Sequence, residues 1–214
     1  MSSDKVVILG GGPGGYEAAL VAAQLGAEVT VVDSDGLGGS AVLTDCVPSK
    51  TLIATAELMS EVEGAAELGL NFTDSEGDSA KTLRVDLGRV NARVKRLAAD
   101  QSDDIARRLA KEDVQVVTGR GVLDGPGRVV VGDTTYDADA VLVATGAAPR
   151  TLPTAQPDGE RILTWEQVYD LTEVPSELIV VGSGVTGAEF ASAYLALGIP
   201  VTLVSSRDRV LPGE

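Results

Sequence analysis

Short runs of aliphatic residues alternate along the chain with longer stretches in which apolar positions recur at helical spacing. Residues 5–9 form a short, continuous run rich in β-branched residues and predict a buried strand of a parallel sheet, and residues 28–32 predict a second strand. Between them, residues 16–25 predict a helix whose alanines allow close packing on that sheet, and Gly26 is a typical C-terminal stop. The beginning of the chain is therefore predicted to form a βαβ unit of about 30 residues.

The middle of the chain has a more varied pattern. The Ala/Leu/Glu-rich residues 52–68 predict a helix, and residues 71–80 predict a polar loop. Residues 85–112 are amphipathic and predict one long helix, or two in succession, with a solvated charged face. Residues 140–144 predict another buried strand, and the proline-rich residues 147–159 predict a linker. Short strands separated by Gly, Asp and Pro turns predict an antiparallel meander; they span residues 114–117, 121–123, 128–131 and 134–136.

The end of the chain repeats the pattern of its beginning. Residues 178–181, 188–197 and 201–204 predict a second strand, helix and strand, and a shift of 172 positions superposes this unit on the first without a gap. The shift places Gly182, Gly184 and Gly187 on Gly10, Gly12 and Gly15, Glu189 on Glu17, and Gly198 on Gly26. Such a register predicts a repeated module rather than two unrelated glycine-rich turns.

Each module carries the G-x-G-x-x-G pattern between a strand and a helix. In the first module Asp33 lies 23 positions after Gly10, at the end of the second strand. The glycines let a pyrophosphate approach the helix N-terminus, and Asp33 can accept hydrogen bonds from a ribose. No Gly-Lys-Ser/Thr follows, which excludes a Walker loop. The chain is predicted to have an α/β fold with two dinucleotide-binding modules, in domains over residues 1–148 and 149–214.

The second module differs from the first where its second strand ends. Ser205 takes the place of Asp33, and Arg207 and Arg209 follow it. A carboxylate at this position repels a 2′-phosphate, whereas Ser and Arg can hydrogen-bond and neutralise one. The difference favours NADPH over NADH at this module. In the alternative interpretation, Arg207 and Arg209 only decorate a loop.

The single cysteine, Cys46, stands at the predicted start of the long helix, with Pro48, Ser49 and Thr51 in the first turn. Pro suits this turn because it lacks the N–H that would have no partner there. The helix N-terminus and Lys50 favour a thiolate over a thiol. The alternative is that Cys46 is a small buried hydrophobic residue.

Composition narrows the functional classes. The net charge is −15 and aromatic residues make up 3% of the chain, which argues against nucleic-acid binding. With one cysteine, no basic N-terminal segment and no apolar run of about 20 residues, we expect a soluble, cytoplasmic protein without membrane insertion. No metal site is predicted. The chain contains no histidine, so proton transfer would fall to Lys, Glu, Asp, Tyr or Cys.

Taken together, these motifs resemble the pyridine nucleotide-disulfide oxidoreductases, such as dihydrolipoamide dehydrogenase, glutathione reductase and mercuric reductase. The resemblance covers essentially all 214 residues. It implies an FAD-binding Rossmann-like three-layer domain with an antiparallel meander, followed by the start of a second Rossmann-like domain that binds NADPH or NADH. It assigns FAD binding to Gly10, Gly12, Pro13, Gly14, Gly15, Asp33, Gly38, Gly39, Ser40, Lys50, Gly121, Ala144, Thr145 and Gly146. It assigns nicotinamide-cofactor binding to Gly182, Gly184, Val185, Thr186, Gly187, Glu189, Ser205, Ser206 and Arg207.

The sequence departs from the family in one chemical respect. The family pattern Gly-Gly-x-Cys-x-x-x-x-Cys-x-Pro-x-Lys has two redox cysteines, but Ala41 stands at the first position and only Cys46 remains. A dithiol–disulfide couple needs two sulfurs, so reduction of lipoamide or glutathione by the usual route is not expected. The pattern is similar to that of the family's quinone reductases, which pass electrons from flavin directly to a quinone-type acceptor.

Family members are more than twice as long, so we expect these residues to be the N-terminal portion of a longer, homodimeric enzyme, inactive as a portion alone. By analogy, the catalytic residues are Cys46, Lys50 and Glu189, with Lys50 near flavin N5 and paired with Glu189. A structural ion pair is the alternative for these two. Three other functions stay open: a dihydrolipoamide dehydrogenase-like enzyme, a peroxide or oxygen reductase using a Cys46 sulfenic acid, and a non-catalytic nucleotide-binding fragment.

Overall fold

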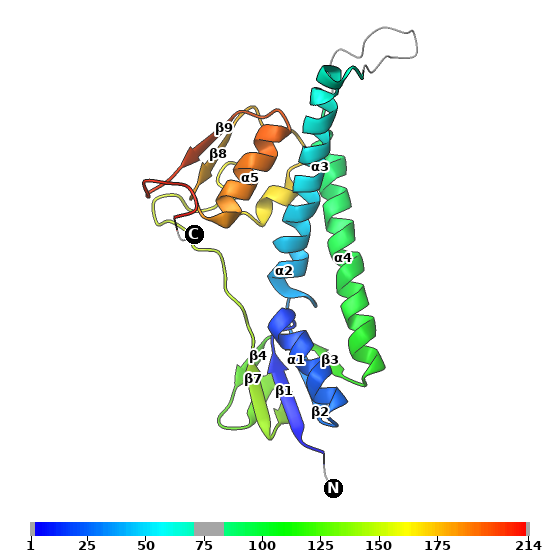
Figure 1. Cartoon of the computed structure of the whole chain (residues 1–214). Coiled ribbons are helices and arrows are strands. Elements are labelled where there is room, and N and C mark those ends of the chain that lie inside the picture. Colours follow the sequence, from blue (N-terminus) through cyan, green and yellow to red (C-terminus); the bar gives the residue numbers. More distant parts are fainter. Residues whose placement is uncertain (1–2, 71–83, 213–214) are drawn as a thin grey trace. The chain divides into compact units, whose positions relative to one another are not determined.

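The computed structural model describes residues 3–70 and 84–212 (Figure 1). Internal contacts divide the chain into two compact units, and each contains one of the two predicted modules. The first unit comprises Met1–Pro48 and Lys95–Arg150, and the second comprises Ser49–Val94 and Thr151–Glu214. The domains predicted over residues 1–148 and 149–214 stay a prediction.

The first unit is built on a four-stranded parallel sheet with the strand order β3-β2-β1-β7. Val7, Ile8 and Leu9 on the central strand β1 are buried, as expected for a strand covered on both faces. Leu9 pairs with Val32 on one side and with Val143 on the other, so three strands end together where the first glycine loop begins. The strands are β1 (Lys5–Leu9), β2 (Glu28–Asp33), β3 (Gln115–Thr118) and β7 (Ala140–Val143).

Helix α1 (Pro13–Gln24) packs on β1 and β2. It begins three residues before the predicted start, because Gly12 already caps it in an extended conformation, with φ −71° and ψ −178°. Pro13 then occupies the first helical position. An N–H at this position would have no partner within the helix, so proline loses no hydrogen bond there. Gly26 ends the helix with φ +92°, as predicted.

The predicted meander is confirmed for three of its four strands. These strands form an antiparallel sheet in the order β4-β5-β6. The fourth prediction, residues 114–117, was wrong about its partner, because β3 pairs in parallel with β2. Helices intervene between β2 and β3, and such a crossover returns the chain parallel to the strand it left. The meander strands are β4 (Gly121–Leu123), β5 (Arg128–Val131) and β6 (Thr134–Asp137).

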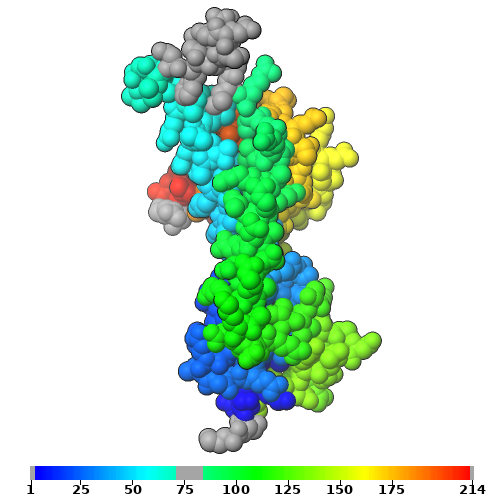
Figure 2. Space-filling view, turned by 90° about the vertical axis from the view of Figure 1, so that its right-hand side faces the viewer, coloured from blue at the N-terminus to red at the C-terminus, as the bar shows by residue number. Residues whose placement is uncertain are grey.

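Among the described residues between β2 and β3 there are three α-helices and a short 3₁₀ helix. The five-residue α2 was not predicted, and α3 begins at Cys46, as expected. The amphipathic stretch is one helix, α4, whose buried positions recur at helical spacing. Figure 2 shows α4, in green, with a surface open to solvent along its length, in agreement with its predicted solvated face. The helices are α2 (Gly39–Leu43), α3 (Cys46–Gly64), η1 (Ala65–Leu68) and α4 (Leu87–Lys111).

The second unit contains the repeated module. Strands β8 (Leu178–Val181) and β9 (Val201–Val204) pair in parallel, and α5 (Val185–Ala196) connects them. Like α1, α5 begins three residues before its predicted start. A short 3₁₀ helix, η2 (Gln167–Asp170), precedes β8. In the predicted linker 147–159 there is no helix or strand, only an isolated bridge between Leu152 and Ala155.

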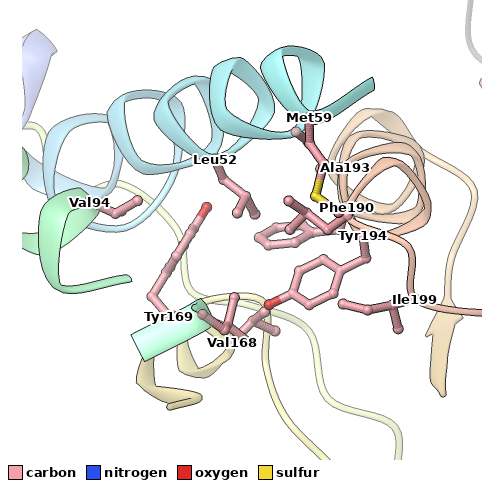
Figure 3. Packing of buried hydrophobic residues seen from close by; sticks show 12 residues of the cluster. Leu52, Met59, Val94, Val168, Tyr169, Phe190, Ala193, Tyr194 and Ile199 are labelled. Carbon is pink, nitrogen blue, oxygen red and sulfur yellow. The ribbon is translucent and has the colours of Figure 1, made fainter. Parts of the chain in front are cut away.

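Aromatic side chains form the core of the second unit (Figure 3). The ring of Phe190 lies 5.7 Å from that of Tyr169 and 6.4 Å from that of Tyr194, centroid to centroid. Leu52 and Met59 of α3 are among the aliphatic residues that pack with these rings in the same cluster. The module helix α5 is thus fixed against α3 by large apolar side chains, each of which stabilises the fold by about 1.5–3 kcal/mol through burial.

The predicted polar loop at residues 71–80 lies outside the described residues. Across residues 3–70 and 84–212, none of the helices has the length and apolar content that crossing a bilayer requires.

Candidate active site

The first glycine loop joins β1 to α1 through close backbone contacts. The N–H of Gly10 donates to the carbonyl of Val32 at 2.8 Å. A Cβ on Gly10 would overlap the carbonyl of Ala144, and a Cβ on Gly15 would overlap the carbonyl of Gly10. Only glycine fits these two positions, because any side chain would force strand and helix apart.

The loop offers free hydrogen-bond donors to a ligand. Among the described residues, no acceptor binds the N–H of Gly12 or of Gly14, and Pro13 and Gly14 are exposed. Both N–H groups lie at the N-terminus of α1, where the helix dipole favours an anion. The residues present therefore fit the pyrophosphate of a dinucleotide.

Asp33, at the end of β2, already accepts three backbone hydrogen bonds. One carboxylate oxygen accepts the N–H of Gly11 at 2.6 Å, and the other accepts those of Asp35 and Gly36 at 2.8 and 2.7 Å. The carboxylate thus closes the turn after β2 and ties it to the glycine loop. Two oxygens can accept about four bonds, which leaves room for the predicted ribose contact.

The remaining predicted FAD residues of the first unit surround this loop. Gly38 donates to the carbonyl of Gly11 at 2.8 Å, and the backbone of Gly39 lies against Gly12, with Ser40 exposed beside it. The N–H of Ala144 donates to the carbonyl of Leu9 at 2.8 Å, so Ala144, Thr145 and Gly146 leave the sheet beside the loop. Gly121 lies on β4, where a Cβ would overlap the side chain of Leu9; packing alone explains this glycine.

Cys46 is the first residue of α3, and its side chain is exposed. Pro48 and Ser49 are buried in the first turn behind it. The predicted position at a helix N-terminus is confirmed, and the alternative of a buried hydrophobic cysteine is not supported. An exposed thiol at a helix N-terminus is a candidate for reactivity.

In the second unit the structure brings together the two other predicted catalytic residues. The ammonium of Lys50 on α3 lies 2.5 Å from a carboxylate oxygen of Glu189 on α5. The side chain of Glu189 is 23% exposed and that of Lys50 is 62% exposed. A pair with so much contact with water stabilises a fold by only about 0–1 kcal/mol, so stability alone is a weak reason for it.

The second glycine loop has the geometry of the first. Gly184 caps α5 with φ −74° and ψ −176°, and a Cβ on Gly187 would overlap the carbonyl of Gly182. Among the described residues, no acceptor binds the N–H of Gly184 or of Thr186. These donors, beside the exposed Val185, fit a second pyrophosphate.

The predicted cofactor residues after β9 lie in an exposed turn. Ser205, Ser206 and Arg207 are all exposed. The sequence prediction missed the neighbour that holds this turn: the hydroxyl of Ser183, inside the glycine loop, lies 2.6 Å from that of Ser205. A signal was present, because Gly11 and Asp33 are both replaced by serine in the repeat.

In the part of the chain that the structure describes, no three His, Cys, Asp or Glu side chains are grouped so that they could hold a metal ion.

Comparison with known proteins places these features in a family. A family model described as pyridine nucleotide-disulphide oxidoreductase matches residues 4–214. A relative from Mycobacterium tuberculosis named NAD(P)H dehydrogenase (quinone) is 56% identical over 224 residues. A dihydrolipoyl dehydrogenase from Chlorobaculum parvum is 36% identical over 214 residues. Each comparison covers 98% of this chain and 44% of the relative, so the chain spans less than half the length of these curated relatives.

Solved structures share the fold. The crystal structure of LpdA from Mycobacterium tuberculosis matches with a TM-score of 0.86 and 53% identity, over 98% of this chain and 46% of that chain. The flavoprotein disulfide reductase RclA from Escherichia coli matches with a TM-score of 0.79 and 22% identity, over 98% of this chain and 44% of that one. The predicted α/β fold class is confirmed.

Proposed function

The chain belongs to the pyridine nucleotide-disulphide oxidoreductase family, and from that premise we propose that it is part of an FAD-dependent enzyme that transfers electrons from NAD(P)H to a quinone-type acceptor. The observation that carries the proposal is the pair of glycine loops with equivalent backbones, each with free N–H groups at a helix N-terminus. Two loops of this kind suit two dinucleotides, one of which donates electrons to the other.

FAD is assigned to the first loop and NAD(P)H to the second. When bound, FAD accepts a hydride from the nicotinamide and releases the electrons one or two at a time. In this assignment Gly12 and Gly14 hold the FAD pyrophosphate, and Asp33 holds its ribose. Gly184 and Thr186 hold the pyrophosphate of NAD(P)H.

The acceptor is proposed to be a quinone because the chain lacks the second sulfur of a redox disulfide. Ala41 stands where the family has a cysteine, and Cys46 is the only cysteine among these 214 residues. The relative with 56% identity is named as a quinone dehydrogenase, which agrees with this assignment. One NAD(P)H and one proton then convert one quinone into a hydroquinone.

Lys50 and Glu189 are proposed to position the flavin and the nicotinamide. The first unit supplies a comparison, because Glu17 occupies the same position on α1 and pairs with Arg108 at 3.8 Å. Both pairs link a module helix to another helix, but the pair of Glu189 is shorter, and the side chain of Glu189 is 23% exposed against 54% for Glu17. The closer pair suits a positioning role, whereas the looser pair suits a surface contact.

Steady-state kinetics of the complete FAD-loaded protein test the function. We expect reduction of a soluble quinone by NADPH or NADH and no appreciable reduction of lipoamide or glutathione disulfide. The Cys46→Ala variant should retain quinone reduction, because no disulfide exchange is required. Loss of activity in this variant with FAD still bound would instead indicate sulfur chemistry, and a protein unable to bind FAD would overturn the proposal.

A matched pair of variants tests the role of Glu189. Glu189→Gln should slow reduction of the bound flavin by NAD(P)H at least about tenfold, an increase of about 1.4 kcal/mol in the barrier. Glu17→Gln breaks the equivalent pair on α1 and should leave the rate unchanged. Equal rates in both variants would leave the Lys50–Glu189 pair a purely structural contact.

The setting of the enzyme is also part of the proposal. We infer a cytoplasmic protein that acts as a homodimer when the polypeptide is complete. Gel filtration with light scattering of the complete protein tests the dimer, and cell fractionation tests the compartment.

A further inference from the structure

A pair of serine hydroxyls holds the second glycine loop against the turn that follows β9. The hydroxyls of Ser183 and Ser205 lie 2.6 Å apart. Ser183 is 5% exposed, whereas Ser205 is exposed. A buried hydroxyl with a short partner is fixed in position, because losing the bond would leave it without water to replace it.

Ser183 also fixes the residues that follow Ser205. Its carbonyl accepts the N–H of Leu211 at 2.7 Å, and its hydroxyl makes a longer contact of 3.5 Å with the carbonyl of Arg209. The hydroxyl of Ser205 accepts the N–H of Arg207 at 2.9 Å. The turn that carries Arg207 and Arg209 is therefore anchored to the glycine loop at several points.

The first module performs the same task with a carboxylate. There Asp33 accepts the N–H of Gly11 and closes its own turn through the N–H groups of Asp35 and Gly36. In the second module the Ser183 hydroxyl replaces the Gly11 N–H, and the Ser205 hydroxyl replaces the carboxylate. The second module thus keeps the hydrogen bond between the glycine loop and the turn, and keeps the turn closed, but lacks the negative charge of Asp33.

We propose that Ser183 is a positioning residue for cofactor selection: it holds Ser205 and the Arg207–Arg209 turn in a closed, uncharged arrangement that accepts the 2′-phosphate of NADPH. This inference rests on the proposed function, because it assumes that the second module binds NAD(P)H. Ser183 itself does not contact the phosphate.

The charges around the turn agree with this role. Arg207 and Arg209 are exposed, with Asp208 between them, and Arg207 makes no ion pair with any carboxylate among the described residues. A guanidinium in this state can bind a phosphate through two parallel hydrogen bonds. An anchored turn loses less conformational entropy on binding than a mobile one.

Binding measurements on the complete, FAD-loaded protein test the inference. The probes are adenosine 2′,5′-bisphosphate and 5′-AMP, which differ only in the 2′-phosphate, and the Kd of each is measured by calorimetry. The wild-type protein should bind the bisphosphate more tightly. Ser183→Ala should raise the Kd of the bisphosphate about fivefold, which is the loss expected for one hydrogen bond, and should change the Kd of 5′-AMP by less than about twofold.

Two further variants sharpen the test. Ser183→Thr retains the hydroxyl and should retain the preference for the bisphosphate. Ser205→Asp restores the charge of the first module at an exposed position and should weaken the bisphosphate at least about tenfold through repulsion. If Ser183→Ala does not fold, Ser205→Asp decides. The control is Thr202→Val, which removes a hydroxyl that contacts Glu177 at 3.4 Å elsewhere on β9 and should change neither Kd.

The possible failures are distinguishable. Equal binding of both probes by the wild-type protein, or an equal loss of both in Ser183→Ala, would overturn the role of Ser183 alone. Absence of binding of either probe would overturn the assignment of NAD(P)H to this module. The ratio of KM for NADPH to KM for NADH should rise in Ser183→Ala while kcat stays constant; a fall in kcat alone would indicate a general structural effect.

Discussion

The two glycine-loop modules share one backbone but are anchored in different ways. A shift of 172 positions brings the bounds of α1 onto those of α5. The Gly10 N–H donates to the last buried residue of β2, Val32, at 2.8 Å, and the Gly182 N–H donates to Val204 of β9 at 2.9 Å. The repeated sequence therefore specifies the loop, the cap and the strand pairing twice.

The two helices bury different faces. On α1 the buried residues are Gly15, Ala19 and Leu20, which pack with the four-stranded sheet. On α5 they are Phe190, Ala193 and Tyr194, and the position of Leu20 is taken by the exposed Ser192. In addition to its own strands β8 and β9, α5 packs through aromatic side chains against residues of α3 and η2 (Figure 3). The same strand–loop–helix module can thus be stabilised through different faces of its helix.

Truncation of the aromatic core gives the largest expected difference. Phe190→Ala should lower the free energy of unfolding by about 3–4 kcal/mol, because it leaves a large cavity between α3 and α5. The equivalent residue on α1 is Ala18, and Ala18→Gly should cost only about 1 kcal/mol through helix propensity. Urea denaturation, with the fluorescence of Trp165 as a probe of the second unit, measures the first change. A loss below 1 kcal/mol in Phe190→Ala would show that α5 is held by its sheet after all.

The close-packed glycines give the next largest effect. Gly15→Ala should cost about 3 kcal/mol and reduce the FAD content, because the new Cβ overlaps the Gly10 carbonyl and overpacking cannot relax there. Gly10 itself is held against Ala144, whereas Gly182 has open space around it. Gly187→Ala should therefore cost less, about 1–2 kcal/mol, since its loop can shift. Thermal denaturation and flavin absorbance of both variants test the order, and equal losses would contradict it.

The residue that closes each turn gives a smaller difference. Asp33→Ala removes three hydrogen bonds to a charged group and should cost about 2 kcal/mol, while Ser205→Ala should cost about 1 kcal/mol. Asp35→Ala is the control for removal of a nearby charge and should cost less than about 0.5 kcal/mol, because its exposed side chain closes no turn. Denaturation midpoints of the three variants rank these contributions. The reverse order of Asp33 and Ser205 would mean that the serine tether is the stronger one.

The sequence predicts the strands and the repeat well because both depend on local patterns. It places the starts of α1 and α5 three residues late, because the glycines after Gly12 and Gly184 look like loop residues. In the structure these glycines are helical, and Gly15 and Gly187 allow the helix to approach the carbonyls of Gly10 and Gly182 closely. The parallel partner of β3 could not be read from its own residues, since the direction of pairing depends on the crossover before it.

In the candidate site too, features set by local sequence could be predicted, whereas contacts between distant residues could not. Glycine loops, Asp33 and the position of Cys46 follow from spacing along the chain. The pairing of Lys50 with Glu189, 139 positions apart, came only from the family resemblance, because no local pattern links them. Ser183 was missed although the repeat held the signal: its change from Gly11 is matched by the change from Asp33 to Ser205.

The smallest change in stability expected at neutral pH comes from the hydroxyl of Tyr194 on α5. The equivalent residue on α1 is Ala22, which has no hydroxyl. Tyr194 is fully buried, and its hydroxyl has no hydrogen-bond partner among the described residues. Tyr194→Phe should therefore raise the free energy of unfolding by about 1 kcal/mol. Tyr16→Phe, on the partly exposed Tyr16 of α1, is the control and should change it by less than about 0.5 kcal/mol.

The pH dependence of the same variant provides a second measurement. Burial raises the pKa of Tyr194 from 10.0 to about 12. Above pH 10 the unfolded chain loses this proton while the folded chain retains it, so wild-type stability falls by up to about 3 kcal/mol as the pH passes through 12. Tyr194→Phe lacks this term, and its advantage over the wild type should grow between pH 10 and 11.5 in urea titrations. A constant or shrinking advantage would show that the hydroxyl is hydrated in the folded protein, so that the core around α5 is less dry than its burial indicates.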